Sequence, residues 1–289
     1  MTYKFSEKVS HLQASAIREI LKFTSDPEVI SFAAGNPSPE AFPVDELNRI
    51  SEEIFKENPI GALQYSLTEG YTPLRDLLKK ELEKKGEFDP ERDDLIITSG
   101  AQQANELACK VLCDPGDILC CEAPSFIGSL NAFKSYNVEL KGITLHEDGV
   151  DLKELEEAFA TGKVKVFYII SNFQNPTGLT TSLEKRKAIY ELAKKYSVMI
   201  LEDNPYGELR FEGEIFPSLK SYDTKGLVLF FGTFSKIFAP GFRLGWVSAS
   251  PEILEKFNIS KQAADLQAST ISQMEMAKFI EMYDLDAHV

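Results

Sequence analysis

The sequence has no run of apolar residues long enough to cross a membrane as a helix. Its first residues contain no apolar segment of the kind found in secretory signals, so no signal peptide is expected. Positive charge is scarce, because 31 Lys and Arg face 45 Asp and Glu, which gives a net charge of −14. An acidic chain is repelled by phosphate backbones and anionic lipids, which disfavours nucleic acid and membrane surfaces as partners.

Cysteine and histidine are also rare, with four Cys and three His in 289 residues. No histidine lies at a zinc-finger spacing from the clustered cysteines, so we predict no metal site. Buried, reduced thiols are typical of cytoplasmic proteins, and the cytoplasm is therefore the expected location. The four cysteines are Cys109, Cys113, Cys120 and Cys121.

Short apolar runs alternate with helical patterns over the second third of the chain and beyond. The runs are DLIIT, DILCCE, KVFYII, VMILED and LVLFFGT, and GWVS adds one more strand. They lack a strict alternation of polar and apolar residues. This is expected of strands that are covered on both faces, because both sets of side chains are then buried. The pattern predicts an α/β fold, a three-layer α/β/α sandwich with a mostly parallel sheet. Ligands of such sheets bind beyond the carboxyl ends of the strands, here after Thr98, Ile170 and Leu201.

The residues before these runs are expected to form an N-terminal arm and helices. Helical patterns cover residues 15–23 and 44–58, with a turn-rich stretch between them. A further helix is predicted from Pro73 to Gly86, since proline is preferred at the start of a helix and glycine after its end.

One lysine, Lys236, directly follows the strand LVLFFGT. Thr233 and Ser235 precede it and Arg243 follows it. A lone lysine at a strand end is more often simply solvated. Hydroxyls and a guanidinium beside it, however, can together hold a phosphate, while the amine binds an aldehyde as a Schiff base.

Polar residues also end three other strands. VMILED ends in Asp203, with Tyr206 three residues later. A buried carboxylate is costly unless it meets a cation, although an isolated Asp is more often a turn or cap residue. KVFYII leads to Asn-Pro-Thr-Gly, which begins at Asn175 and by itself indicates a turn. DLIIT leads to a helix start that is either a simple cap or a phosphate site; its residues are Ser99, Gly100, Ala101 and Gln102.

These motifs, in this order, resemble the signature of fold-type I aminotransferases of class I/II, which use pyridoxal 5'-phosphate (PLP). The resemblance implies that Lys236 carries PLP as a Schiff base and that Asp203 pairs with the protonated pyridine nitrogen. It implies that Asn175 and Tyr206 contact the ring hydroxyl. Phe126 matches the aromatic ring that stacks on the cofactor, although a phenylalanine there also suits a core.

The resemblance further implies a phosphate site and a homodimer. Tyr65 matches a tyrosine that reaches the phosphate of the neighbouring subunit, so shared sites are expected. The phosphate contacts fall on Ser99, Gly100, Ala101, Gln102, Thr233, Ser235 and Arg243.

Within the family, the sequence is most similar to the 2-aminoadipate and kynurenine aminotransferase branch. The similar segments are ASAIRE, SFAAGNPSPEAFP, YSLTEGYTPLR and SNFQNPTGL, and the resemblance runs from about residue 14 to residue 265. In that branch Arg18 can meet a substrate side chain, and Gly35 and Asn36 lie where the substrate carboxylate passes. The expected reaction moves an amino group from 2-aminoadipate, an aromatic or a similar amino acid to a 2-oxo acid such as 2-oxoglutarate.

The resemblance also implies a domain division. Residues 1–45 form an arm and part of a small domain, and residues 46–289 form the PLP-binding large domain. The chain ends where the family's C-terminal small domain begins, and no arginine follows Arg243 to clamp the substrate carboxylate.

Three alternatives to an active aminotransferase follow. One is a truncated PLP-binding fragment without full activity, and another is different PLP lyase chemistry, such as β-elimination or decarboxylation, on the same fold. The third is the effector-sensing domain of a transcriptional regulator. The acidic charge and the lack of a winged helix ahead of the arm disfavour it.

Overall fold

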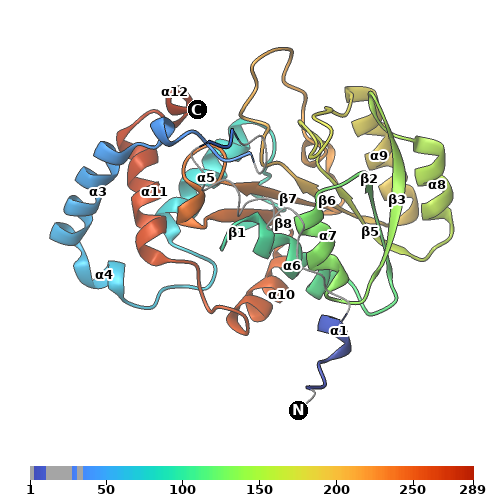
Figure 1. The fold of residues 1–289 in the computed structure, drawn as a ribbon, viewed down its shortest axis with the longest axis horizontal. Coiled ribbons are helices and arrows are strands. Elements are labelled where there is room, and N and C mark those ends of the chain that lie inside the picture. The colour runs from blue at the N-terminus through green and yellow to red at the C-terminus, as the bar shows by residue number, and fades with distance from the viewer. Residues whose placement is uncertain (1–2, 11–27, 31–34) are drawn as a thin grey trace.

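A computed structural model of the chain describes residues 3–10, 28–30 and 35–289. Among these residues one eight-stranded sheet forms the centre of the molecule, in the order β1-β8-β7-β6-β5-β2-β3-β4 (Figure 1). The helix expected over residues 15–23 lies outside the described residues. The strands are β1 (Asp94–Thr98), β2 (Ile118–Ala123), β3 (Glu139–His146), β4 (Gly149–Val150), β5 (Val164–Ile169), β6 (Met199–Asp203), β7 (Val228–Thr233) and β8 (Gly245–Ala249).

The sheet is mostly parallel, which confirms the predicted fold class. Strands β3, β2, β5, β6 and β7 all run in one direction. The strand expected at GWVS is β8, which is antiparallel to both β7 and β1. The short strand β4 is antiparallel to β3 at the opposite edge.

Helices cover both faces of the sheet and so make three layers. On one face α6 (Ala101–Leu112), α7 (Ile127–Lys134) and α10 (Pro251–Gln262) pack against the strands. On the other face lie α8 (Leu152–Ala160), α9 (Leu183–Tyr196) and α5 (Thr72–Lys84). All residues of β7 are buried, with Phe230 in the cluster on one face and Phe231 in that on the other. This double burial explains why the apolar runs do not alternate.

The helix predicted between Pro73 and Gly86 is α5. Its buried residues Leu74, Leu78 and Leu82 recur every four positions and form the stripe that faces the sheet. Pro73 lies in the first turn, and Gly86 follows the end with a φ of 71°, a conformation that glycine adopts without strain.

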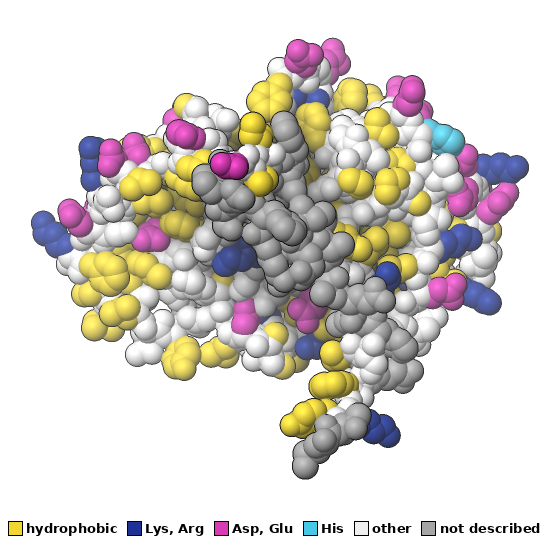
Figure 2. All heavy atoms as spheres, in the orientation of Figure 1, with side chains coloured by type: hydrophobic (Ala, Val, Ile, Leu, Met, Phe, Trp, Pro, Cys, Tyr) yellow, Lys and Arg dark blue, Asp and Glu magenta, His cyan; other side chains and the backbone are white. Residues whose placement is uncertain are grey.

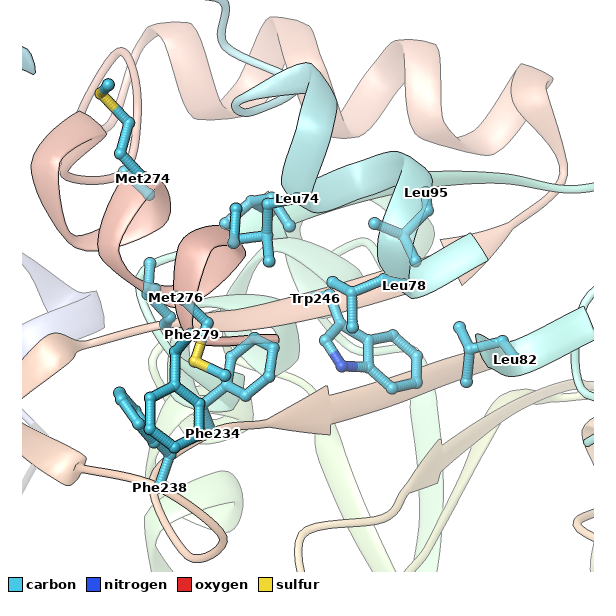
Figure 3. Close-up of a cluster of buried hydrophobic side chains, with 14 of the residues drawn as sticks. Leu74, Leu78, Leu82, Leu95, Phe234, Phe238, Trp246, Met274, Met276 and Phe279 are labelled. Atoms are coloured by element: carbon cyan, nitrogen blue, oxygen red, sulfur yellow. The ribbon is translucent and has the colours of Figure 1, made fainter. Parts of the chain in front are cut away.

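The chain returns to its N-terminal half through α11 (Thr270–Met282), which packs beside α3 (Val44–Glu57) and α5 (Figure 1). Figure 3 shows the apolar cluster that joins them, in which Phe279 lies close to Phe238. The two ring centroids are 4.8 Å apart. The remaining described helices are short: α1 (Glu7–Ser10), α4 (Pro59–Leu63), α12 (Leu285–His288), η2 (Pro39–Ala41), η3 (Lys220–Tyr222) and η4 (Pro240–Phe242).

No helix among the described residues combines the length and the apolar character that crossing a membrane requires. Nor does this part of the chain bring together a group of His, Cys, Asp or Glu side chains suited to a metal ion.

Candidate active site

The carboxyl ends of β5, β6 and β7 meet the start of α6 around a cleft of about 210 Å³. Parallel strands end at one edge of a sheet, so residues far apart in the sequence are brought together there. The structure thus gathers most of the side chains that the motifs predicted. Those that line the cleft are Ala101, Gln102, Phe126, Asp203, Tyr206, Thr233, Ser235, Lys236 and Arg243.

Asp203, the last residue of β6, is a buried carboxylate with one unused oxygen. Its Oδ2 accepts hydrogen bonds from Asn105 Nδ2 at 3.1 Å and from the Tyr168 hydroxyl at 2.9 Å. Its Oδ1 is buried and has no partner among the described residues. Burial raises the pKa of Asp203 to about 6, and the two hydrogen bonds lower it only in part. The free oxygen is therefore suited to a cation or an N–H donor that enters the cleft.

The sequence reading missed the two residues that hold Asp203. Asn105 lies on the buried side of α6, between Ala104 and Ala108, and lines the cleft. Tyr168 lies within β5 and also shares a hydrogen bond with Ser129, at 2.9 Å. An asparagine on the apolar side of a helix needs a polar partner, and that was the available signal for Asn105.

Asn175 does not line the cleft itself but forms a pair with Tyr206, which does. Asn175 Nδ2 donates to the Tyr206 hydroxyl at 3.1 Å. Burial raises the pKa of Tyr206, and the hydrogen bond from Asn175 counteracts only part of that effect. The Asn-Pro-Thr-Gly segment is indeed a turn, in which Thr177 N donates to Gln174 Oε1 at 3.0 Å. The turn directs the Asn175 amide towards Tyr206.

Lys236 follows β7 and extends its amine into the cleft. Nζ donates to the carbonyl oxygen of Gly35 at 3.1 Å, so Gly35 lies next to the amine. Burial, and then the charge of Arg243, lower the pKa of Lys236. A lowered pKa increases the share of neutral amine, which is the nucleophilic form. Asn36, the neighbour of Gly35, is exposed, and Arg18 lies outside the described residues.

Hydroxyls and a guanidinium surround the start of α6. Arg243 Nη1 donates to Ser235 Oγ and Nη2 to the Ser99 carbonyl oxygen, both at 3.4 Å. Thr233 Oγ1 donates to Ser235 Oγ at 3.0 Å. Gly100 has a φ of 79°, and a Cβ there would lie 2.5 Å from Arg243 Nη2, so the close approach requires glycine.

Three predicted site residues have further contacts or lie elsewhere. The Ser99 hydroxyl donates to Asp265 at 2.7 Å. Phe126 lines the cleft and also packs against the core, and its stacking on a cofactor stays a prediction. Tyr65 is 79% exposed and does not line the cleft.

The arrangement fits PLP at each of its reactive groups. The unpartnered Asp203 oxygen suits the protonated ring nitrogen, and the Lys236 amine suits the aldehyde. The positive end of the α6 dipole, with Arg243 and the hydroxyls of Thr233 and Ser235, suits a phosphate.

Comparisons with known proteins agree with this chemistry. The family Aminotransferase class I and II matches residues 27–280. The aromatic-amino-acid aminotransferase 1 of Thermococcus litoralis is 43% identical, over 99% of this chain and 70% of its own length. The 2-aminoadipate transaminase of Thermus thermophilus is 37% identical, over 93% of this chain and 67% of its own length.

The fold comparison gives the same result. The crystal structure of Pyrococcus horikoshii kynurenine aminotransferase in complex with PMP superposes with a TM-score of 0.93. That enzyme is 40% identical, and the match covers 98% of this chain and 71% of the other. The chain belongs to the aminotransferase class I and II family and is a PLP-dependent aminotransferase that takes amino groups from amino acids.

Proposed function

We propose that this chain moves the amino group of an aromatic amino acid, 2-aminoadipate or a similar donor to a 2-oxo acid such as 2-oxoglutarate. The names of the relatives support this range of donors. The observation that carries the proposal is the unpartnered, buried oxygen of Asp203 in the cleft that Lys236 enters. A buried carboxylate with a free oxygen and an amine with a lowered pKa are the two groups that PLP chemistry needs most.

The proposed cofactor contacts follow the geometry of the cleft. Lys236 binds the aldehyde, Asp203 the ring nitrogen, and Asn175 with Tyr206 the ring hydroxyl, while Phe126 stacks on the ring. When bound, PLP supplies an electron-withdrawing ring that weakens the C–H bond at the α-carbon of the amino acid. The phosphate contacts are Ser99, Gly100, Ala101, Gln102, Thr233, Ser235 and Arg243.

Lys236 is the proposed proton carrier. Because burial and the nearby Arg243 charge lower its pKa, its free amine can take the α-proton as a general base. The same amine would then give the proton, as a general acid, to the cofactor carbon that carried the aldehyde. Gly35 lies within hydrogen-bond distance of Nζ, so we assign the passage of the substrate carboxylate to Gly35 and Asn36. Arg18 remains the proposed contact for the substrate side chain.

A homodimer with shared sites is part of the proposal. Figure 2 shows hydrophobic side chains gathered over α4, on the end of the molecule that carries α3 and α11. Such a patch is typical of an interface with another protein surface. Sedimentation of the purified chain tests this assignment, with a monomer at all concentrations as the contrary result. The exposed apolar residues there are Phe55, Ile60, Leu63, Tyr65 and Leu67.

The division at residue 45, with residues 46–289 as the large domain, and the cytoplasmic location remain predictions.

Absorbance spectroscopy tests the proposed reaction. Added PLP should give the visible band of a lysine-bound cofactor, and glutamate or 2-aminoadipate should shift the band to that of the amine form. Lys236→Ala should abolish the visible band, and an unchanged band in that variant would refute the role of Lys236. A band that no amino acid shifts would point to a cofactor-binding fragment, and release of pyruvate and ammonia would point to lyase chemistry.

A further inference from the structure

A polar cluster around one buried lysine contacts the start of α6 and lies outside the lining of the cleft. Lys261, in the last turn of α10, has a side chain that is 0% exposed. Its amine donates to both carboxylate oxygens of Asp265, at 2.8 and 2.9 Å, and to Gln103 Oε1 at 2.7 Å. All three hydrogen bonds of this lysine therefore go to two residues that contact the turn before α6.

Asp265 holds that turn from the side opposite the cleft. Ser99 Oγ and Gln103 Nε2 each donate to Asp265 Oδ2 at 2.7 Å. Ser99 N also donates to Gln103 Oε1 at 2.9 Å, which closes the network. Burial acts to raise the pKa of Asp265, but the hydrogen bonds from Lys261, Ser99 and Gln103 outweigh it and hold the pKa below its usual value. Both oxygens of Asp265 therefore accept hydrogen bonds, Oδ1 from Lys261 and Oδ2 from Lys261, Ser99 and Gln103.

Arg243 contacts the same turn from the cleft side, through the Ser99 carbonyl oxygen and against Gly100. The backbone of the turn consequently lies between a carboxylate on one side and a guanidinium on the other. The segment that carries Asp265 is itself tied down, because Gln267 Oε1 accepts from Ser66 N.

The burial of Lys261 needs an explanation beyond stability. A fully buried ammonium loses its hydration, and apolar residues of similar volume often give an equally stable or more stable fold. Burial lowers the pKa of Lys261, which reflects that cost. The cluster orders one short turn, and this turn leads directly into Ala101 and Gln102, the first residues of α6, which line the cleft at the positive end of that helix.

We propose that Lys261 and Asp265 are positioning residues for the cofactor phosphate, which act through Ser99 and Gln103 on the turn before α6. This inference rests on the proposed function of the cleft. Neither residue is assigned a contact with the cofactor. Their effect is to fix the turn, and with it the start of α6 at Ala101 and Gln102, before the phosphate arrives, so that binding does not have to order this segment.

The test compares two ligands that differ only in the phosphate. Dissociation constants of PLP and of pyridoxal, which lacks the phosphate, are measured by absorbance for the wild type, Lys261→Met and Asp265→Asn. Lys261→Met removes the three hydrogen bonds that hold Asp265 and Gln103 beside the turn, and Asp265→Asn leaves the buried Lys261 amine without its counter-charge. PLP affinity should therefore fall about tenfold or more, while pyridoxal affinity stays within about twofold. Asp265→Asn keeps the size of the side chain and provides the gentler variant if Lys261→Met does not fold.

Lys220→Met is the matched control. Lys220 is another buried lysine, paired with Asp93 at 2.7 Å and Asp223 at 3.3 Å. It contacts the carbonyl oxygen of Val228, the first residue of β7, and so lies at the end of that strand opposite the cleft. Its loss should lower the melting temperature and leave the ratio of the two affinities unchanged.

Three results would overturn the inference. They are an unchanged ratio in both cluster variants, an equal loss of PLP and pyridoxal affinity, and an equal change of the ratio in Lys220→Met. A wild type that binds neither compound would overturn the proposed function itself, and the inference with it.

Discussion

The substitution Asp203→Asn distinguishes two effects of this buried carboxylate. One is its effect on the free energy of unfolding, and the other is its effect on the affinity for PLP. The Asn oxygen can accept the hydrogen bonds that Asn105 and Tyr168 now donate to Oδ2. The new amide then takes the place of the unpartnered Oδ1. The change therefore removes the charge and keeps the shape and both existing hydrogen bonds.

The magnitude follows from the pKa of Asp203, which burial raises from 3.8 to about 6. Because the folded state binds the proton more tightly than the unfolded state, the stabilising contribution is complete below pH 3.8 and is lost as the pH rises through 6. The shift corresponds to about 3 kcal/mol of unfolding free energy. The unpaired amide of the variant costs about 1–3 kcal/mol at every pH.

Urea unfolding of the cofactor-free proteins between about pH 4 and about pH 8 measures this difference. The unfolding free energy of Asp203→Asn relative to the wild type should rise by about 2.4 kcal/mol across the range, because a small part of the contribution is already lost at about pH 4. With saturating PLP at about pH 8 the order should reverse, because only the wild type gains the full stabilisation of a tightly bound ligand.

A constant difference between the two proteins from about pH 4 to about pH 8 would refute the reasoning about burial. Equal PLP affinity in the two proteins would refute the pairing of Asp203 with the ring nitrogen. The two readouts are independent, so either claim can fail alone.

Three further substitutions test the fold around the site. The unfolding free energy of Glu122→Gln relative to the wild type should rise between about pH 4 and about pH 9. Burial raises the pKa of Glu122 to about 8, and the stability of its protonated form is lost as the pH rises through that value; equal urea curves at both pH values would contradict this. Phe279→Ala should lower the unfolding free energy by about 3–5 kcal/mol, because it empties a cluster beside Phe238, and a loss under about 1 kcal/mol would mean that the cluster does not hold α11. Lys278→Ala, on the same helix but in partly exposed ion pairs, should cost at most about 1 kcal/mol in the same assay, and a larger loss would contradict the weak role assigned to those pairs.

The sheet was predictable because its strands are buried on both faces. An apolar run such as LVLFFGT is too short for a typical helix and is bounded by turn residues, which favours a strand covered on both faces, and helical patterns separate the runs at the spacing of parallel strands. Helices α10 and α11 were not assigned from the sequence. In α11 the buried residues include Thr270, Gln273 and Met276 as well as Phe279, so they do not form one clean apolar stripe. A helix that packs against several neighbours is buried on more than one side, so its sequence does not show the single apolar stripe that identifies an amphipathic helix.

The reactive side chains were predictable for a different reason. Asp203 ends a strand, Lys236 and Asn175 follow one, and the topology brings the ends of parallel strands to one edge. Their supporting partners depend on contacts between distant segments. Lys261, for example, is one basic residue in a charged helix, and nothing local distinguishes it from the exposed Lys256 one turn before it.

The strand register decides on which face of the sheet the side chains of Glu202 and Asp203 lie. Tyr168 of β5 pairs with Leu201 of β6, and residues two apart on a strand share a face, so the Tyr168 hydroxyl reaches Asp203. Glu202 points to the opposite face, where Ser171 Oγ and the amides of residues 219 and 220 donate to its two oxygens.

One of these adjacent acids is therefore satisfied within the fold, and the other keeps a free oxygen in the cleft. A slip of one residue in the pairing of β5 and β6 would exchange their faces. Glu202 would then lose its donors, and Asp203 would lose both the cleft and the hydrogen bond from Tyr168. The chemistry of the site thus depends on the hydrophobic pattern of β6, because that pattern fixes the register and the register decides which carboxylate meets a ligand.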